Sequence, residues 1–218
     1  MDRRLPAAAI VLAAASAAPA SNLILNGSFE QNTASIYALN LSNDQFNAAV
    51  AFVTAFGGAS EIDMSPAHAG GPHDGSYAVS LHTKSFNTDL RDAFSFDLSA
   101  PMVAGREYTV EFWASRVDFF PGTLEIGISD SATDFGTLVY TTPSITVSQY
   151  SLFSHTFTAT MDAAYLTVRS GSDPDSFVVV DAFSLTAVPV PLPGAALAGG
   201  SLAGLLALRR ARPCAPRG

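Results

Sequence analysis

One acidic side chain lies within an otherwise apolar strand pattern near the end of the chain. Asp181 falls in Phe177-Val-Val-Val-Asp-Ala-Phe-Ser-Leu185, where simple alternation places it on one face with the apolar residues Phe177, Val179, Phe183 and Leu185. A carboxylate on such a face is costly unless it is hydrogen-bonded, paired with a cation or bound to a metal. Alternatively, it accepts hydrogen bonds from the backbone N–H groups of a neighbouring turn. Asp181 is therefore a candidate site whose partner the sequence leaves open.

A second candidate is Trp113, the only tryptophan of the chain. It falls on the polar face of its predicted strand, together with Thr109 and Glu111. Sugars dock their apolar faces on aromatic rings, so an exposed Trp113 predicts ligand binding. Further aromatic candidates in or near loops are Tyr37, Tyr77, Phe119 and Phe120. The alternative is that Trp113 packs beneath an adjoining loop or in a second layer.

Catalytic constellations are missing from the sequence. It has no Gly-x-Ser-x-Gly elbow, no His-Glu-x-x-His pair and no phosphate-binding glycine-rich loop. His68 and His73 are five residues apart in a Gly/Pro-rich loop, which does not match zinc-site spacing, and we interpret His82 and His155 as ordinary loop or core residues. Counting alone leaves open a glycosidase-like pair of carboxylates.

Period-2 alternation of apolar and polar residues dominates the middle of the chain. Predicted strands cover residues 77–82, 94–98, 108–113, 124–129, 153–157, 165–169 and 177–185. Turn signals such as Asp74-Gly75 and Pro121-Gly122 separate them. Short strands at this spacing predict an all-β fold, an antiparallel two-sheet sandwich over residues 21–187. We expect residues 31–58 to form a mobile or decorated region, in which residues 48–56 make a strand or a single helical turn.

The sandwich region resembles carbohydrate-binding-module-like jelly rolls of the galactose-binding-like superfamily. The resemblance lies in Asn22-Leu-Ile-Leu-Asn-Gly-Ser-Phe-Glu30, in Asp74-Gly-Ser-Tyr-Ala-Val-Ser-Leu81, in Gly105-Arg-Glu-Tyr-Thr-Val-Glu-Phe-Trp113 and in Val180-Asp-Ala-Phe-Ser-Leu185. It implies that Glu30 and Asp181 help to hold a structural Ca²⁺, with backbone carbonyls completing the shell. Oxygen ligands and the absence of thiols from this region suit Ca²⁺. Such an ion would tie the first strand to the last.

Both ends of the chain have the composition of targeting segments. Arg3 and Arg4 precede an Ala-rich apolar run that ends in Ala18-Pro-Ala20, which predicts a signal peptide over residues 1–20. The region 188–218 combines a Pro-rich strip, an apolar run over residues 194–208 and a basic tail that contains the chain's single cysteine, Cys214. About 15 helical residues span only ~22 Å, so the apolar run is a marginal transmembrane helix.

The C-terminal region resembles a PEP-CTERM-type sorting signal, in the variant whose motif reads Val-Pro-Leu-Pro-Ala. The motif residues are Val190, Pro191, Leu192, Pro193 and Gly194, and Gly194 departs from the usual Ala. The basic stop is Arg209, Arg210 and Arg212. The resemblance implies processing by an exosortase in the inner membrane of a Gram-negative bacterium, with transient membrane attachment.

The charge of the exported region differs from that of the whole chain. Residues 21–187 carry five basic residues against eighteen acidic ones, a net charge of −13, whereas the whole chain carries −8. Without a basic patch, binding to nucleic acid is not expected. The remaining basic residues flank the two apolar ends of the chain, so the positive-inside rule predicts export of the acidic middle.

Together these features predict a non-enzymatic protein of the cell surface or extracellular matrix, processed by an exosortase. We expect its sandwich to associate with exopolysaccharide. One alternative is a secreted polysaccharide-acting hydrolase that uses two carboxylates about 5–10 Å apart in one groove. Another is a purely structural surface spacer, which the sequence does not distinguish from the first.

Overall fold

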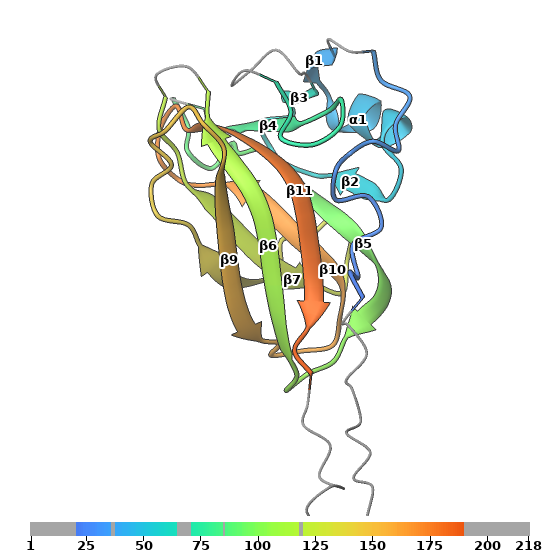
Figure 1. Cartoon of the computed structure of the whole chain (residues 1–218). Coiled ribbons are helices and arrows are strands. Elements are labelled where there is room, and N and C mark those ends of the chain that lie inside the picture. The colour runs from blue at the N-terminus through green and yellow to red at the C-terminus, as the bar shows by residue number, and fades with distance from the viewer. Residues whose placement is uncertain (1–20, 36–37, 65–70, 85, 118–119, 190–218) are drawn as a thin grey trace, which may run out of the picture. The chain divides into compact units, whose positions relative to one another are not determined.

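In the computed structural model, two antiparallel sheets pack face to face (Figure 1). The structure describes residues 21–35, 38–64, 71–84, 86–117 and 120–189. The six-stranded sheet consists, in spatial order, of β1 (Ala38–Leu41), β3 (Ile62–Met64), β4 (Val79–His82), β11 (Phe177–Ala187), β6 (Glu107–Arg116) and β9 (Ser151–Thr158). The five-stranded sheet consists of β2 (Val53–Ala55), β5 (Ala93–Met102), β10 (Ala163–Ser170), β7 (Leu124–Ser129) and β8 (Thr137–Thr141). The predicted all-β sandwich is confirmed.

The chain passes back and forth between the two sheets from β4 onward. Strands β4, β6, β9 and β11 belong to one sheet, and β5, β7, β8 and β10 belong to the other. Every strand pairing is antiparallel. In Figure 1, β9, β6 and β11 run side by side in front of β7, β10 and β5. This crossing of consecutive strands gives the two-sheet jelly-roll arrangement.

Alternation of side chains places the core between the sheets. In β6, Tyr108, Val110 and Phe112 are buried, whereas Glu111 between them is exposed. Phe183 joins the two layers, because its ring lies 4.9 Å from the ring of Phe112 in one sheet and 4.9 Å from that of Phe96 in the other. The period-2 pattern that predicted these strands thus also predicts which residues fill the core.

The alternation breaks in the middle of β11, which corrects one prediction. The register of β11 against β6 shifts between Asp181 and Ser184, and Ala182 has a left-handed backbone with φ of 51°. This β-bulge reverses the side-chain direction. Phe183 therefore enters the main core, while Asp181 lies on the outward face of the six-stranded sheet with Val179. The prediction that Asp181 shares a face with Phe183 and Leu185 is wrong because strict alternation does not allow for the bulge.

Residues 31–58 contain more regular structure than the sequence indicates. Helix α1 (Asn43–Ala49) begins with a capping box, in which the Ser42 side chain and the Gln45 side chain each accept a backbone N–H bond from the other residue. Phe46 of this helix is fully buried and its ring stacks 6.4 Å from that of Phe94. The region expected to be mobile or decorated is thus a helix and two short strands that pack on the core.

The first described residues pair with the last strand. Asn22 forms a bridge with Thr186, and the backbone N–H of Leu23 donates to the carbonyl of Leu185. The Asn22 side chain also accepts a hydrogen bond from the N–H of Leu185. Residues near the two ends of the sandwich therefore lie beside each other.

The predicted targeting segments lie outside the described residues. These are the signal peptide over residues 1–20, the motif at residues 190–194, the apolar run at 194–208 and the basic stop at Arg209, Arg210 and Arg212. The chain divides into two units, Met1–Val188 and Pro189–Gly218. In the part of the chain that the structure describes, no helix has the length and apolar character needed to cross a membrane.

Candidate functional site

The bulge in β11 brings Asp181 next to Trp113 on the outward face of the six-stranded sheet. The two residues are direct cross-strand partners of β11 and β6. Asp181 is 0% exposed even though it points away from the main core, and a small apolar cluster containing Val179 lies beyond it on the same face. The side chain is therefore covered by neighbouring segments rather than by the opposite sheet.

Both oxygens of Asp181 accept hydrogen bonds from the main chain. The N–H of Asp74 donates to Oδ2 at 2.9 Å, and the N–H of Ala182 donates to Oδ1 at 2.6 Å. Burial raises the pKa of Asp181 to about 6; the backbone donors oppose this rise, and the nearby Asp74 carboxylate adds to it. The structure thus shows the alternative that the sequence left open, a carboxylate that caps a neighbouring turn.

Glu30 holds the same turn from the other side. Its Oε1 accepts hydrogen bonds from the N–H groups of Ser76 at 2.7 Å and Tyr77 at 2.9 Å. Gly75 has a φ of +68°, and a Cβ at that position would lie 2.5 Å from Glu30 Oε1. Only glycine fits there without strain. The two acids predicted to act together therefore meet at the turn 74–77 and tie the first segment and the last strand to it.

A metal site at these acids stays a prediction. Among the described residues, no group of three or more His, Cys, Asp or Glu side chains is placed to hold a metal ion. However, Glu30 and Asp74 both line a surface pocket of about 340 Å³, together with residues 24–28. Carboxylate and carbonyl oxygens are the ligands that Ca²⁺ takes. The donor chemistry fits Ca²⁺ provided that main-chain carbonyls supply part of its shell.

Trp113 forms an aromatic cluster with two residues that the sequence did not connect to it. The imidazole of His73 stacks on its indole, with ring centroids 3.9 Å apart and planes 14° apart. Tyr150 meets His73 edge-on at 5.6 Å and 69°. Trp113 and Tyr150 are half-buried, whereas His73 is exposed. The alternative that an adjoining loop covers Trp113 is therefore correct for one face of its ring.

The hydroxyl of Tyr150 lies close enough to Asp181 to feel its charge. It is buried and has no hydrogen-bond partner among the described residues. Burial, together with the negative charge of Asp181, raises the pKa of Tyr150. Trp113, His73, Tyr150 and Asp181 thus form one continuous site, with aromatic rings at the surface and a carboxylate beneath them.

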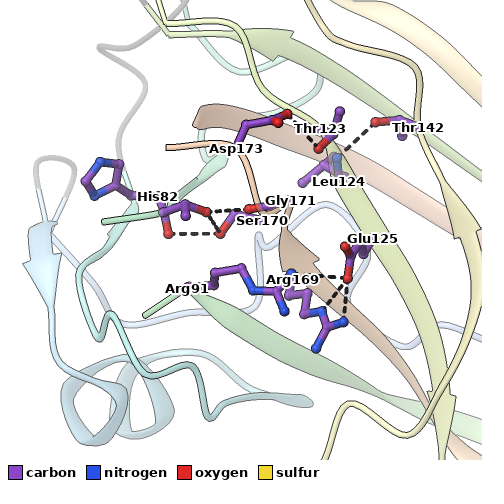
Figure 2. A network of polar contacts seen from close by, with 11 residues as sticks. His82, Arg91, Thr123, Leu124, Glu125, Thr142, Arg169, Ser170, Gly171 and Asp173 are labelled. Atoms are coloured by element: carbon purple, nitrogen blue, oxygen red, sulfur yellow. Dashed lines mark hydrogen bonds and ion pairs between the residues drawn. The ribbon is translucent and has the colours of Figure 1, made fainter. Parts of the chain in front are cut away.

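A second polar cluster, on the five-stranded sheet, is structural. Figure 2 shows Arg91 and Arg169 converging on Glu125, with Arg91 Nη1 3.2 Å and Arg169 Nε 2.6 Å from Glu125 Oε2. Nearby, the hydroxyl of Ser170 donates to the carbonyl of His82 at 2.9 Å. A serine bonded to the main chain is not an activated nucleophile. These contacts join β4, β7, β10 and the segment that precedes β5.

Asp92 is a further buried acid that positions the chain. Its carboxylate accepts hydrogen bonds from the N–H groups of Glu61 at 3.0 Å and His82 at 2.9 Å. Burial raises the pKa of Asp92 to about 6 against the effect of these donors. Burial also lowers the pKa of His82, and the Lys84 charge acts in the same direction. Like Asp181, Asp92 is fully buried and holds backbone N–H groups.

Comparisons with known proteins extend the description of the fold. No family model matches the chain, and no curated protein matches it. Among solved structures, an arabinose-bound GH51 α-L-arabinofuranosidase aligns with a TM-score of 0.52 and 14% identity, over 76% of this chain and 26% of that chain. This chain thus spans about a quarter of that enzyme's length. At this identity the similarity shows a shared β-sandwich fold and nothing more.

Similar solved structures also include carbohydrate-binding modules. The CBM22-1 xylan-binding domain of Paenibacillus barcinonensis Xyn10C aligns with a TM-score of 0.47 and 14% identity, over 80% of this chain and 99% of that chain. A CBM4 module aligns with a TM-score of 0.43 and 16% identity, over 63% of this chain and 95% of that chain.

Proposed function

We propose that this chain is an exported, non-catalytic surface or matrix protein whose β-sandwich binds polysaccharide. The observation that carries the proposal is the aromatic cluster of Trp113, His73 and Tyr150 on the outward face of the six-stranded sheet. Aromatic rings at a protein surface offer the apolar platform on which sugar rings stack. Leu152, the cross-strand neighbour of Trp113, is 51% exposed and extends this platform.

The geometry does not favour the alternative of a hydrolase. Such an enzyme needs two accessible carboxylates on opposite sides of a scissile bond. At this site, Asp181 is fully buried and both of its oxygens accept backbone N–H groups, while Glu30 holds the turn 74–77. Their role in this structure is to position backbone.

The binding proposal is tested with a glycan array and with pull-down of the polysaccharide made by the source organism. The wild-type protein is expected to retain polysaccharide, and Trp113→Ala is expected to lose it. Phe86→Ala is the matched control, because Phe86 is a 79% exposed aromatic residue in the loop between β4 and β5. If no glycan binds to the wild-type protein, the purely structural spacer is the better description.

Exosortase processing is the second part of the proposal. It is supported by the residue types at Val190, Pro191, Leu192, Pro193 and Gly194, followed by the basic stop at Arg209, Arg210 and Arg212. Mass spectrometry of the mature protein tests it. We expect a C-terminus near Pro193 or Gly194, at the cell surface or in the medium. A mature chain that still contains Arg212 would contradict processing.

A structural Ca²⁺ is the third part of the proposal, and it is independent of the other two. Glu30 and Asp181, with backbone carbonyls near the turn 74–77, would hold it. The carboxylate of Asp74 lies close enough to Asp181 to raise the pKa of Asp181, and the ion would supply positive charge between these acids. The role of these residues is to tie the first segment to β11.

A further inference from the structure

The aromatic cluster already contains a nitrogen heterocycle. The imidazole of His73 lies against the face of Trp113 at a centroid distance of 3.9 Å, with the ring of Tyr150 at its side. His73 belongs to the loop before β4 and is exposed, whereas Trp113 belongs to the sheet. An aromatic face attracts positively charged nitrogen groups through its quadrupole. The protein's own side chain thus occupies a position suited to a cationic group.

Two acidic residues neighbour this position. Asp181 pairs across the strands with Trp113, and Asp74 follows His73 directly in the chain. Within the described part of the chain, no salt bridge involves Glu30, Asp74 or Asp181. The basic residues with described ion pairs instead bind other acids: Lys84 pairs with Glu61, and Arg91 and Arg169 pair with Glu125.

The net charge of residues 21–187 also favours a positively charged ligand. Residues 21–187 carry a net charge of −13. Such a field attracts a cationic polymer over roughly one Debye length, about 8 Å at physiological ionic strength, and it repels an anionic one. A neutral sugar could donate hydroxyl hydrogen bonds to an accessible carboxylate, but it would gain nothing from the net charge. The combination of aromatic face, nearby carboxylates and net charge therefore selects for a positive ligand.

Building on the polysaccharide-binding function proposed above, we infer that the ligand is an amino-sugar polymer with free, protonated amino groups. Its sugar ring stacks on Trp113, and its ammonium group takes the place of the His73 imidazole beside Tyr150 and Asp74. His73 moves aside when the ligand binds. The inference thus commits to a de-N-acetylated polysaccharide rather than to a neutral or uronic-acid polymer.

The test compares glucosamine oligomers with N-acetylglucosamine oligomers of equal length, titrated into the purified protein. We expect the glucosamine oligomers to bind at least about tenfold more tightly. Trp113→Ala should weaken this binding about tenfold or more, while His73→Ala, which removes the internal competitor, should strengthen it about two- to tenfold. Phe86→Ala should leave binding unchanged.

A milder pair of variants covers the case in which Trp113→Ala fails to fold. Asp74→Asn removes one charge at the site but keeps the backbone N–H that Asp181 accepts. Asp130→Asn removes the same charge from an exposed position directly after β7. Asp74→Asn should weaken the binding of glucosamine oligomers severalfold more than Asp130→Asn does. Equal effects of the two variants would overturn the inference.

Two further outcomes separate this inference from the proposed function. If neutral glycans bind through Trp113 and glucosamine oligomers do not, the inference is wrong and the polysaccharide-binding function stands. If no glycan of any charge binds, both are wrong. Polylysine measures attraction that depends on charge alone: Trp113→Ala should not change its binding. A parallel loss of polylysine and glucosamine binding in that variant would contradict a specific site.

Discussion

The most quantitative prediction concerns Asp181→Asn and the dependence of stability on pH. In the folded protein, burial raises the pKa of Asp181 from 3.8 to about 6. Because the folded state then binds the proton more tightly than the unfolded state does, this residue stabilises the fold most below pH 3.8. The contribution falls as the pH rises through 6. Asparagine carries no titrating proton and lacks this contribution at every pH.

The magnitude follows from the two pKa values. A rise from 3.8 to about 6 corresponds to about 3 kcal/mol, which the wild-type protein loses between acidic and neutral pH. Asparagine accepts a hydrogen bond with only one of its two terminal atoms, so one backbone N–H, of Asp74 or Ala182, loses its partner. That loss costs about 1–3 kcal/mol at every pH. The variant should therefore be clearly less stable than wild type near pH 4, and near pH 7.5 it should be as stable as wild type or up to about 2 kcal/mol more stable.

Urea denaturation in the presence of EDTA, repeated across this pH range, measures both effects. The difference in free energy of unfolding between wild type and variant isolates Asp181, because other titrating groups contribute equally to both. Asp130→Asn controls for the loss of one negative charge at an exposed position. Parallel profiles for wild type and Asp181→Asn, or a difference that grows with pH, would refute the account of a buried carboxylate at this site.

Three further perturbations test the turn, the core and the ion. Gly75→Ala should lose about 1–3 kcal/mol of stability, because alanine disfavours the left-handed backbone at this position and its Cβ would clash with Glu30. Gly105 has a φ of +81° but open space where a Cβ would lie, so Gly105→Ala should lose only the stability that comes from the backbone conformation. Equal losses in the two variants would refute the clash with Glu30. Phe183→Ala should lose about 3–5 kcal/mol in urea denaturation because its ring packs against both sheets; a loss below about 1 kcal/mol would place it outside the core. Added Ca²⁺ should raise the melting temperature of the wild-type protein and EDTA should lower it, whereas both should have little effect on Glu30→Gln. If neither Ca²⁺ nor EDTA changes the melting temperature of the wild-type protein, the result counts against a bound ion.

The long strands were predictable because alternation over five or more residues is a strong signal. Strands β5, β6, β7, β9, β10 and β11 lie where the sequence places them. Strands β1, β2 and β3 have only three or four residues each, too few for a period to be recognised. Helix α1 was missed because it buries a single side chain, Phe46, and so has no apolar stripe.

The candidate site was predictable only in part. The matching of Glu30 and Asp181 to one structural site followed from the resemblance, and both acids indeed meet at the turn 74–77. The bulge at Ala182 has no local signal, so the face on which Asp181 lies was predicted incorrectly. His73 stacks on Trp113 and Tyr150 meets His73, although both residues are about 40 positions from Trp113 in sequence; such contacts depend on tertiary structure.

The central claim is that the face bearing Trp113 binds polysaccharide, and intrinsic fluorescence tests it most directly. Trp113 is the only tryptophan of the chain, so its emission reports on this site alone. Titration with a polysaccharide that the protein retains in pull-down should give a saturable change in emission. The midpoint should agree with the affinity measured independently. Retention of the polysaccharide with no change in Trp113 emission, and with full retention by Trp113→Ala, would contradict the claim.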